Sequence, residues 1–359
     1  MQTDSKNSSG ATHRFEHHAM ACDWELVIAG EEAEYAQQVA WAAWDEVVRV
    51  ECQLSRFIAS SDVFQINALA PGETIAVGLA TLQCLRLARE IHDQTGGAFD
   101  VSIGALMDES QGRRKNEDSS QLLLFSEPEM LHENTSSAMG FHLLQISEED
   151  SSVSVSAEGV RLDLGAVGKG YAIDQVAAVL RDWGVNNALV HSGQSTVMAM
   201  GAPDVPFQAS ASEEAPSEEV IGDESGWIVA LRDPRNQERP LVSVRLRDRV
   251  LSGSGLLLHG RHIVDPRVGH SATPSMAKRL ATWASLPLAC NEREGDAECL
   301  PAARSDALST GFMVLTDEEI DAFCRAHREV SALLIDDGPQ TKITCFGEWN
   351  DVVSTVAIS

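Results

Sequence analysis

The chain has 359 residues, of which 43% are hydrophobic, and its formal net charge is −27. This much apolar sequence is enough for a buried core in one large domain or two. Nucleic acids and anionic membranes are bound through clustered Lys and Arg, so the acidic charge argues against both as partners.

The beginning of the chain lacks the signals of export. Residues 1–18 contain no apolar core of a signal peptide, and no apolar run elsewhere is long enough to cross a membrane. We therefore expect a cytoplasmic protein with no membrane segment. The seven cysteines form no C-x-x-C pair and their number is odd, which argues against a disulfide framework or a structural zinc site and favours buried free thiols.

Apolar patterning in the first third of the chain predicts strands and two long helices. Residues 1–12 are expected to be disordered, and residues 13–28 to form a pair of strands. Apolar residues spaced by three and four predict a helix over 31–57, with Phe57 at the end of its buried face, and a second helix over 77–94.

The rest of the chain alternates between insertions, hairpins and helices. Polar, charged stretches at 108–140 and 203–226 predict mobile insertions. The remaining expected elements are a hairpin over 152–164, a helix from 171 to about 184, a strand at 188–190, an antiparallel hairpin of 227–233 with 241–247, helices over 305–315 and 317–327, and strands near 330–335 and 341–346. Without a repeating strand–helix–strand order, these elements predict a single α+β domain over residues 13–355.

The stretch RLDLGAVGKGYAID at residues 161–174 has the composition of a phosphate-binding turn. It is not a Walker motif, because Asp163 stands at the first glycine position and Gly170 follows Lys169 in place of Ser or Thr. A short strand, a glycine turn and a helix start would nevertheless present backbone N–H groups and positive dipole to an anion. A tight turn with no ligand is the alternative.

Several stretches around this turn share their order with a known family. They are HHAMACDWEL at 17–26, SRFIASSDVFQIN at 55–67, TGGAFDVSIGAL at 95–106, HSGQS at 191–195, SGSGLLLHGRHIVDPRVGHSA at 252–272 and SDALSTGFMVL at 305–315. Together with the glycine turn they resemble the FAD:protein FMN transferases, also called the ApbE-like family, from about His18 to Phe312.

The resemblance implies both a fold and an activity. The fold would be an ApbE-like, T-fold-related α+β architecture, with antiparallel sheets, packed helices and a flavin site between two halves. The activity would be Mg²⁺-dependent transfer of FMN from FAD to a Ser or Thr hydroxyl of an acceptor protein, with release of AMP. The alternative is an FAD-binding relative that hydrolyses FAD to FMN and AMP or only carries flavin.

The segment SDALST suits a magnesium ion. In a helix, Asp306 and Thr310 share a face, and a carboxylate and a hydroxyl are the hard oxygen donors that Mg²⁺ prefers. The alternative for Asp306 is to cap the start of its own helix. The resemblance adds the carbonyl of Ala166 as a further metal ligand.

The resemblance also assigns a base to the reaction. His262, in RHIVDPRVG, would take the proton of the acceptor hydroxyl, a role that suits a side chain that titrates near neutral pH. Asp265 either orients this histidine or starts a turn with Pro266.

Six residues match positions that contact FAD in the resembled family: Met20, Ala98, Phe99, Asp100, Asp163 and Lys169. Lys169 would lie near the phosphates. For Met20 and Phe99 a place in the hydrophobic core is the alternative.

Two short segments depart from the family pattern, and a third resembles an acceptor. Met20-Ala21-Cys22 stands where the family has Met-Gly-Thr. Ser192-Gly193-Gln194 replaces Gly-Gly-Asn or Gly-Gly-Asp, and Ser192 is expected to narrow the ligand pocket. Residues 8–12, SSGAT, resemble the acceptor sequence of this family, which makes Thr12 a candidate for self-flavinylation.

Overall fold

The computed structural model of the chain describes residues 11–105, 139–203, 225–256, 263, 265–267, 279–289, 299–336 and 342–349. The expected insertions at 108–140 and 203–226 lie almost wholly outside these residues, as does the expected disordered segment up to residue 10. Thr12, which was expected to be disordered, is the first residue of a strand.

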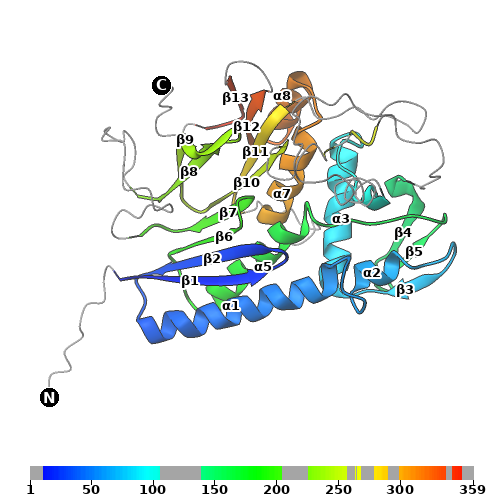
Figure 1. Ribbon diagram of the computed structural model, residues 1–359, viewed down its shortest axis with the longest axis horizontal. Coiled ribbons are helices and arrows are strands. Elements are labelled where there is room, and N and C mark those ends of the chain that lie inside the picture. The colour runs from blue at the N-terminus through cyan, green and yellow to red at the C-terminus, as the bar shows by residue number, and fades with distance from the viewer. Residues whose placement is uncertain are drawn as a thin grey trace, which may run out of the picture.

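An eight-stranded antiparallel sheet forms the centre of the molecule, in the order β1-β2-β6-β7-β10-β11-β12-β13 (Figure 1). Its strands are β1 (Thr12–Ala19), β2 (Cys22–Ala29), β6 (Ala188–Ser192), β7 (Thr196–Met200), β10 (Arg249–Gly255), β11 (Arg279–Pro287), β12 (Ser331–Asp336) and β13 (Ile343–Phe346).

Helices cover one face of this sheet and a hairpin covers the other (Figure 1). The larger core cluster joins the sheet to the helices α1 (Ala33–Leu54), α3 (Leu79–Gln94), α5 (Gly168–Asp182), α7 (Pro301–Phe312) and α8 (Asp317–Ala326). The smaller cluster joins it to the hairpin of β8 (Trp227–Asp233) and β9 (Asn236–Leu246). A small sheet of β3 (Thr74–Ala76), β5 (Ser152–Val155) and β4 (Leu144–Ser147) lies beyond α2 (Asp62–Ile66) and α3, with the 3₁₀ turn η1 (Phe141–Leu143) before β4.

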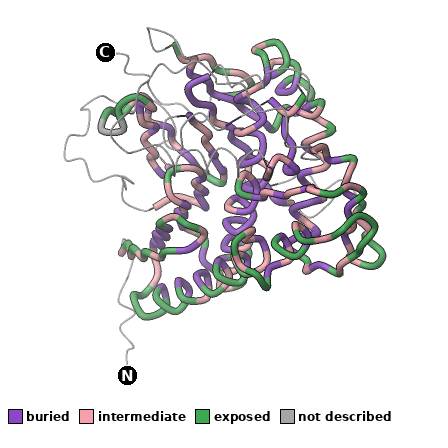
Figure 2. The backbone as a smooth tube through the Cα atoms, turned by 45° about the vertical axis from the view of Figure 1, so that its right-hand side comes forward, coloured by how far each residue is buried: buried purple, intermediate pink, exposed green. Residues whose placement is uncertain are grey.

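Alternation along the central strands divides the side chains between the two cores. In β2, Leu26 and Ile28 pack with the helices, whereas Val27 and Ala29 pack with the hairpin. Because both faces are covered, β6, β7, β11 and β12 are buried over most of their length, as are α5 and α7, whereas α1 and α8 bury only one face. The buried backbone accordingly lies at the centre of the molecule (Figure 2). The α+β fold class predicted from the sequence is confirmed.

Two local predictions were wrong. Residues 152–164 do not form a hairpin, because β5 pairs with β3 and β4 instead, and residue 161 makes only an isolated bridge to Ile103. The first long helix ends at Leu54, so Phe57 lies beyond it and is 72% exposed rather than buried.

The cysteines differ in part from the expectation of buried free thiols. Among the described residues five are free, of which Cys52 and Cys345 are exposed. Cys299 is disulfide-bonded, so the expectation was wrong there. No helix among the residues that the structure describes is long and apolar enough to span a membrane.

The contact between α5 and α7 is unusually close. A Cβ on Gly170 would lie 2.2 Å from the carbonyl oxygen of Ala302, so only glycine fits at this point of α5. One turn further on, the carboxylate of Asp174 accepts hydrogen bonds of 2.9 Å from the backbone N–H groups of both Ala302 and Ala303. Asp174 therefore caps the start of α7 from a neighbouring helix.

We expect this carboxyl to make stability depend on pH. Burial raises the pKa of Asp174 from 3.8 to about 8, against the opposing effect of the two N–H groups. Its contribution to stability is therefore fully present below about pH 4 and is lost as the pH rises towards about 8. Since Asn cannot ionise, urea denaturation should show wild type losing stability relative to Asp174→Asn over this range, by up to about 1.4 kcal/mol per pH unit. Parallel pH profiles of the two proteins would contradict this account.

Candidate functional site

The glycine turn lies directly before α5 and is held by its own backbone. The carbonyl of Leu164 accepts hydrogen bonds from the N–H groups of Val167 (3.1 Å) and Gly168 (2.7 Å), and α5 begins at Gly168, three residues earlier than predicted. Lys169 thus belongs to the first turn of the helix. Its ammonium group donates a 2.8 Å hydrogen bond to the carbonyl of Gly165, which holds the side chain over the turn.

Asp306 meets this turn from α7. Its side chain is 3% exposed, and the carboxylate accepts a 3.1 Å hydrogen bond from the N–H of Gly170. Burial raises the pKa of Asp306, while the charge of Lys169, the Gly170 N–H and the hydroxyl of Thr196 oppose that rise. A carboxylate this deeply buried favours a cation beside it.

The alternative role of Asp306, capping its own helix, is wrong. Helix α7 begins at Pro301, four residues earlier than predicted, and its N-terminal N–H groups are bound by Asp174. Asp306 therefore lies inside the helix, where its carboxylate is available for another partner.

The other expected metal ligands lie on the same two elements. Thr310 follows Asp306 by one helical turn, and its hydroxyl is 3.0 Å from that of Ser254 on β10. Ala166 is half-buried in the glycine turn. The described residues contain no group of three or more His, Cys, Asp or Glu side chains suited to a metal ion. One carboxylate, one hydroxyl and one carbonyl still fit Mg²⁺, which uses few protein carboxylates and takes oxygens from substrate phosphates.

Met20 lies against the glycine turn. A Cβ on Gly168 would be 3.6 Å from the terminal methyl group of Met20. Met20 and Ala21 form the two-residue loop between β1 and β2, and both have positive φ, at 51° and 57°. These angles define a type I′ turn, which glycine or asparagine normally occupies.

The segment of Ala98, Phe99 and Asp100 is buried near the end of α7. A Cβ on Gly311 would lie 3.6 Å from that of Phe99, which places this ring beside the residue after Thr310. The carboxylate of Asp100 accepts hydrogen bonds from the N–H groups of Ser102 (2.8 Å) and Phe141 (3.1 Å), so it also organises its own loop.

Asp163 is paired with a residue that the sequence analysis did not single out. Arg56, with a side chain only 9% exposed, forms a 3.2 Å ion pair with Asp163, and its guanidinium lies 5.0 Å from the ring centroid of Phe57. Arg56 and the exposed Phe57 are therefore further candidates for ligand contact. Both belong to the quoted Ser-Arg-Phe stretch, but helical periodicity assigned Phe57 to the core.

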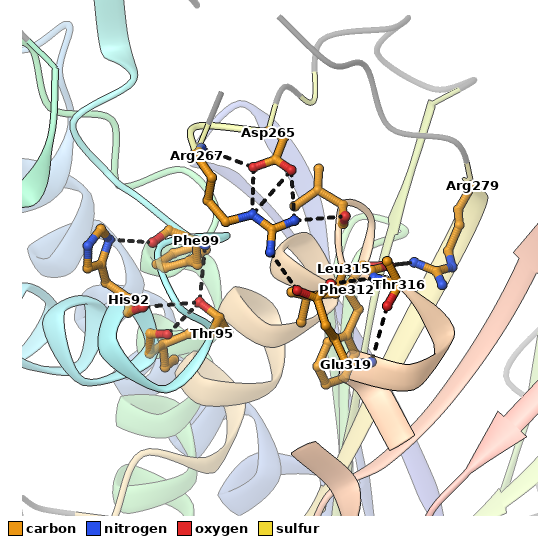
Figure 3. A network of polar contacts seen from close by, with 12 residues as sticks. His92, Thr95, Phe99, Asp265, Arg267, Arg279, Phe312, Leu315, Thr316 and Glu319 are labelled. Atoms are coloured by element: carbon orange, nitrogen blue, oxygen red, sulfur yellow. Dashed lines mark hydrogen bonds and ion pairs between the residues drawn. The ribbon is translucent and has the colours of Figure 1, made fainter. Parts of the chain in front are cut away.

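His262 lies outside the residues that the structure describes, so its predicted role stays a prediction. The turn reading of Asp265 is supported, because its carboxylate accepts a 3.0 Å hydrogen bond from the backbone N–H of Arg267. Arg267 also binds both Asp265 oxygens through its guanidinium and reaches Glu319 on α8 at 2.9 Å (Figure 3). This network attaches the segment after His262 to the start of α8.

The two departures from the family pattern lie side by side. The Cβ of Cys22 is 3.2 Å from where a Cβ on Gly193 would be, and the Gly193 N–H donates a 2.7 Å hydrogen bond to the carbonyl of Asp23. Ser192 is fully buried. The expectation that it narrows a ligand pocket stays a prediction.

A cavity of about 280 Å³ opens on the hairpin side of the sheet. Its walls include His191, Arg232, Gly253 and Trp283. Ser254, whose hydroxyl is 3.0 Å from that of the expected metal ligand Thr310, also lines the cavity.

Comparison with known proteins identifies the family of the chain. The profile of the ApbE family matches residues 20–334. The chain belongs to the ApbE family. The family resemblance predicted from the sequence motifs is thus confirmed.

Similar ApbE proteins are known from sequence and from structure. A protein of Treponema pallidum named FAD:protein FMN transferase is 25% identical over 82% of this chain and 77% of its own length. One of Vibrio cholerae with the same name is 26% identical over 80% and 77%. The solved flavin transferase ApbE of V. cholerae has a TM-score of 0.72 at 19% identity, covering 95% of this chain and 99% of its own. The apo form of the Pseudomonas stutzeri flavinyl transferase ApbE has a TM-score of 0.70 at 20% identity, covering 96% and 98%. These structures establish the ApbE fold of the chain.

The Met20-Ala21 turn gives a prediction about stability. A left-handed conformation costs a non-glycine residue roughly 1–2 kcal/mol, while glycine loses about 0.4–1 kcal/mol through the entropy of the unfolded chain. Ala21→Gly should therefore stabilise the protein by about 0.5–1 kcal/mol in urea denaturation. Ala19→Gly, in the adjoining strand, is the matched control and should destabilise it. Equal effects of the two variants would refute the turn assignment.

The Arg56–Asp163 pair gives a second prediction. Asp163→Asn leaves the guanidinium of Arg56 largely buried without its charged partner, so we expect a loss of about 1–3 kcal/mol of stability together with weaker FAD binding. The double variant Arg56→Met/Asp163→Asn should recover stability but not FAD affinity. Thermal melting and FAD titration by fluorescence measure the two effects. Full recovery of FAD affinity in the double variant would show that the Arg56–Asp163 pair has only a structural role.

Proposed function

We propose that the protein is an Mg²⁺-dependent FAD:protein FMN transferase, which transfers FMN from FAD to a Ser or Thr hydroxyl of an acceptor protein and releases AMP. The observation that carries the proposal is the meeting of the buried Asp306 carboxylate with Lys169 and the start of α5. A pyrophosphate requires backbone N–H groups, a fixed cation and a divalent metal, and all three can be supplied at this point.

In this proposal the phosphates of FAD lie over the glycine turn. Lys169 and the positive end of α5 bind them, and Asp163 contacts the nucleotide beside Arg56. Met20 and the segment 98–100 contact the rest of the cofactor. Asp306, Thr310 and the carbonyl of Ala166 would hold Mg²⁺, which supplies polarisation of the pyrophosphate and stabilises charge on the departing AMP.

The transfer itself is a displacement at phosphorus. His262 accepts the proton of the acceptor hydroxyl, whose oxygen then attacks the FMN phosphorus. A new P–O bond forms to the acceptor, the P–O bond to the bridging oxygen breaks, and AMP leaves with that oxygen. Burial of Asp306 and Phe99 beside the reacting phosphates would exclude water, which favours the protein hydroxyl over hydrolysis.

The proposal predicts a mass change that depends on Asp306. Purified protein incubated with FAD, Mg²⁺ and a peptide containing Ser-Gly-Ala-Thr should add one FMN to the peptide, detected by mass spectrometry. Asp306→Ala should abolish transfer and weaken FAD binding, because it removes the carboxylate that holds the metal.

Asp182→Ala, at the exposed end of α5, is the matched control and should transfer normally. Transfer by Asp306→Ala at the wild-type rate would refute the metal assignment. Free FMN and AMP with an unmodified peptide would instead indicate an FAD pyrophosphatase, and intact FAD a flavin carrier. The same spectra test self-flavinylation at Thr12, which is exposed at the start of β1.

A further inference from the structure

The interface between α7 and the central sheet is built largely from hydroxyl groups. Ser305 donates a 2.7 Å hydrogen bond to the carbonyl of Ala284, and Thr282 donates one to the carbonyl of Ser309. Ser309 in turn lies 2.8 Å from Ser254. Most of these polar side chains are fully buried and have partners, as buried hydroxyls normally do.

Three further hydroxyls in this interface differ, because they have no hydrogen-bond partner of standard geometry among the described residues. They belong to Ser192, Thr196 and Ser252, which are 0%, 1% and 0% exposed. The three residues are neighbours in register, since Ser192 pairs with Thr196 across β6 and β7, and Thr196 pairs with Ser252 across β7 and β10. We call them the hydroxyl row.

The hydroxyl row faces Asp306. Residues opposite one another in antiparallel strands point to the same side of the sheet, and α7 packs on that side against β7 and β10. The hydroxyl of Thr196 is near enough to favour the ionised form of Asp306, although the two groups do not meet in a direct hydrogen bond of standard geometry. The row therefore lies on the side of the sheet that α7 covers, with Thr196 beside the carboxylate.

Three buried hydroxyls without partners would be costly. A buried hydroxyl left without a partner loses its hydrogen bonds to water, and proteins usually meet this need with buried water molecules. The hydroxyl row offers three such groups at neighbouring register positions. Since the Gly170 N–H binds only one side of Asp306, a water in the row would hold the carboxylate from the other side.

We propose that Ser192, Thr196 and Ser252 bind buried water and with it orient the carboxylate of Asp306 towards a divalent cation. This inference rests on the cation site of the proposed function. The three residues are positioning residues, since they act through Asp306. The family pattern has glycine at the position of Ser192, so the hydroxyl at this position is a feature of this chain and not of the family pattern.

Metal binding by the full-length protein tests the positioning role separately from activity. Mn²⁺ is titrated by electron paramagnetic resonance in the presence of FAD, in wild type, Thr196→Val and Ser252→Ala. Loss of a residue that orients a metal ligand costs about 10- to 100-fold in affinity, so each variant should bind Mn²⁺ at least about 10-fold more weakly. Thr196→Ser, which keeps the hydroxyl, should restore binding.

Ser285→Ala is the matched control. Ser285 is an equally buried hydroxyl of the same sheet, but it donates its hydrogen bond to the carbonyl of Val250. This variant should lose some thermal stability and keep its Mn²⁺ affinity. Melting temperatures of all variants show whether they are folded, and wild-type Mn²⁺ affinity in folded Thr196→Val and Ser252→Ala would overturn the positioning role.

A high-resolution crystal structure tests the water itself. Density for ordered water within hydrogen-bond distance of the hydroxyls of the row supports the inference, and the absence of ordered water at all three hydroxyls overturns it. Wild-type protein that binds Mn²⁺ but transfers no FMN would refute the proposed function and leave the row standing. Wild-type protein that binds no Mn²⁺ would overturn the inference, because there would then be no cation towards which the hydroxyl row could orient Asp306.

Discussion

The close contact between α5 and α7 is the constraint on which both the fold and the site depend. It exists because Gly170 has no side chain, which lets the backbone of Ala302 approach to a distance that any Cβ would block. At the same contact Asp174 caps α7, and the N–H of Gly170 binds Asp306. One pair of helices thus fixes the carboxylate of one element beside the lysine of the other. A change that separates them would lower stability and disable the site together.

The overall charge of the chain gives this contact a second importance. A protein of net charge −27 repels the anionic pyrophosphate that it is proposed to bind. The attraction for the pyrophosphate must therefore come from positive groups close to the candidate site. Lys169 lies in the first turn of α5, where the helix dipole adds positive potential, and Arg56 lies nearby through its pair with Asp163. The buried Asp306 adds a local attraction for a metal cation, since a carboxylate removed from water binds a cation strongly.

Much of the fold could be predicted from local pattern, but the centre of the site could not. Helices α1 and α3 and the first strand pair follow apolar periodicity closely. The strands β10 and β11 were missed because several of their inward positions carry Ser and Thr, such as Ser252 and Thr282, in place of large aliphatic residues. The true start of α7 was missed because its first buried residues are proline and alanine, which give a weak apolar pattern. Because that start was missed, Asp306 could be interpreted equally well as the cap of its own helix. The family motifs named the residues of the candidate site, whereas partners distant in the chain, such as Arg56 for Asp163, were found only from the structure.

The two departures from the family pattern are best understood as one local change. Cys22 packs against Gly193, and the Gly193 N–H binds the carbonyl of Asp23, so the β1–β2 turn and the β6–β7 turn are in direct contact. A change in one turn therefore alters the space available to the other. Both turns lie next to Met20 and the hydroxyl row, yet neither interrupts the contact of Lys169 and Asp306 with the glycine turn. The changes thus alter the surroundings of the ligand while the groups proposed for the chemistry stay in place, which argues for a changed fit to substrate over a lost reaction.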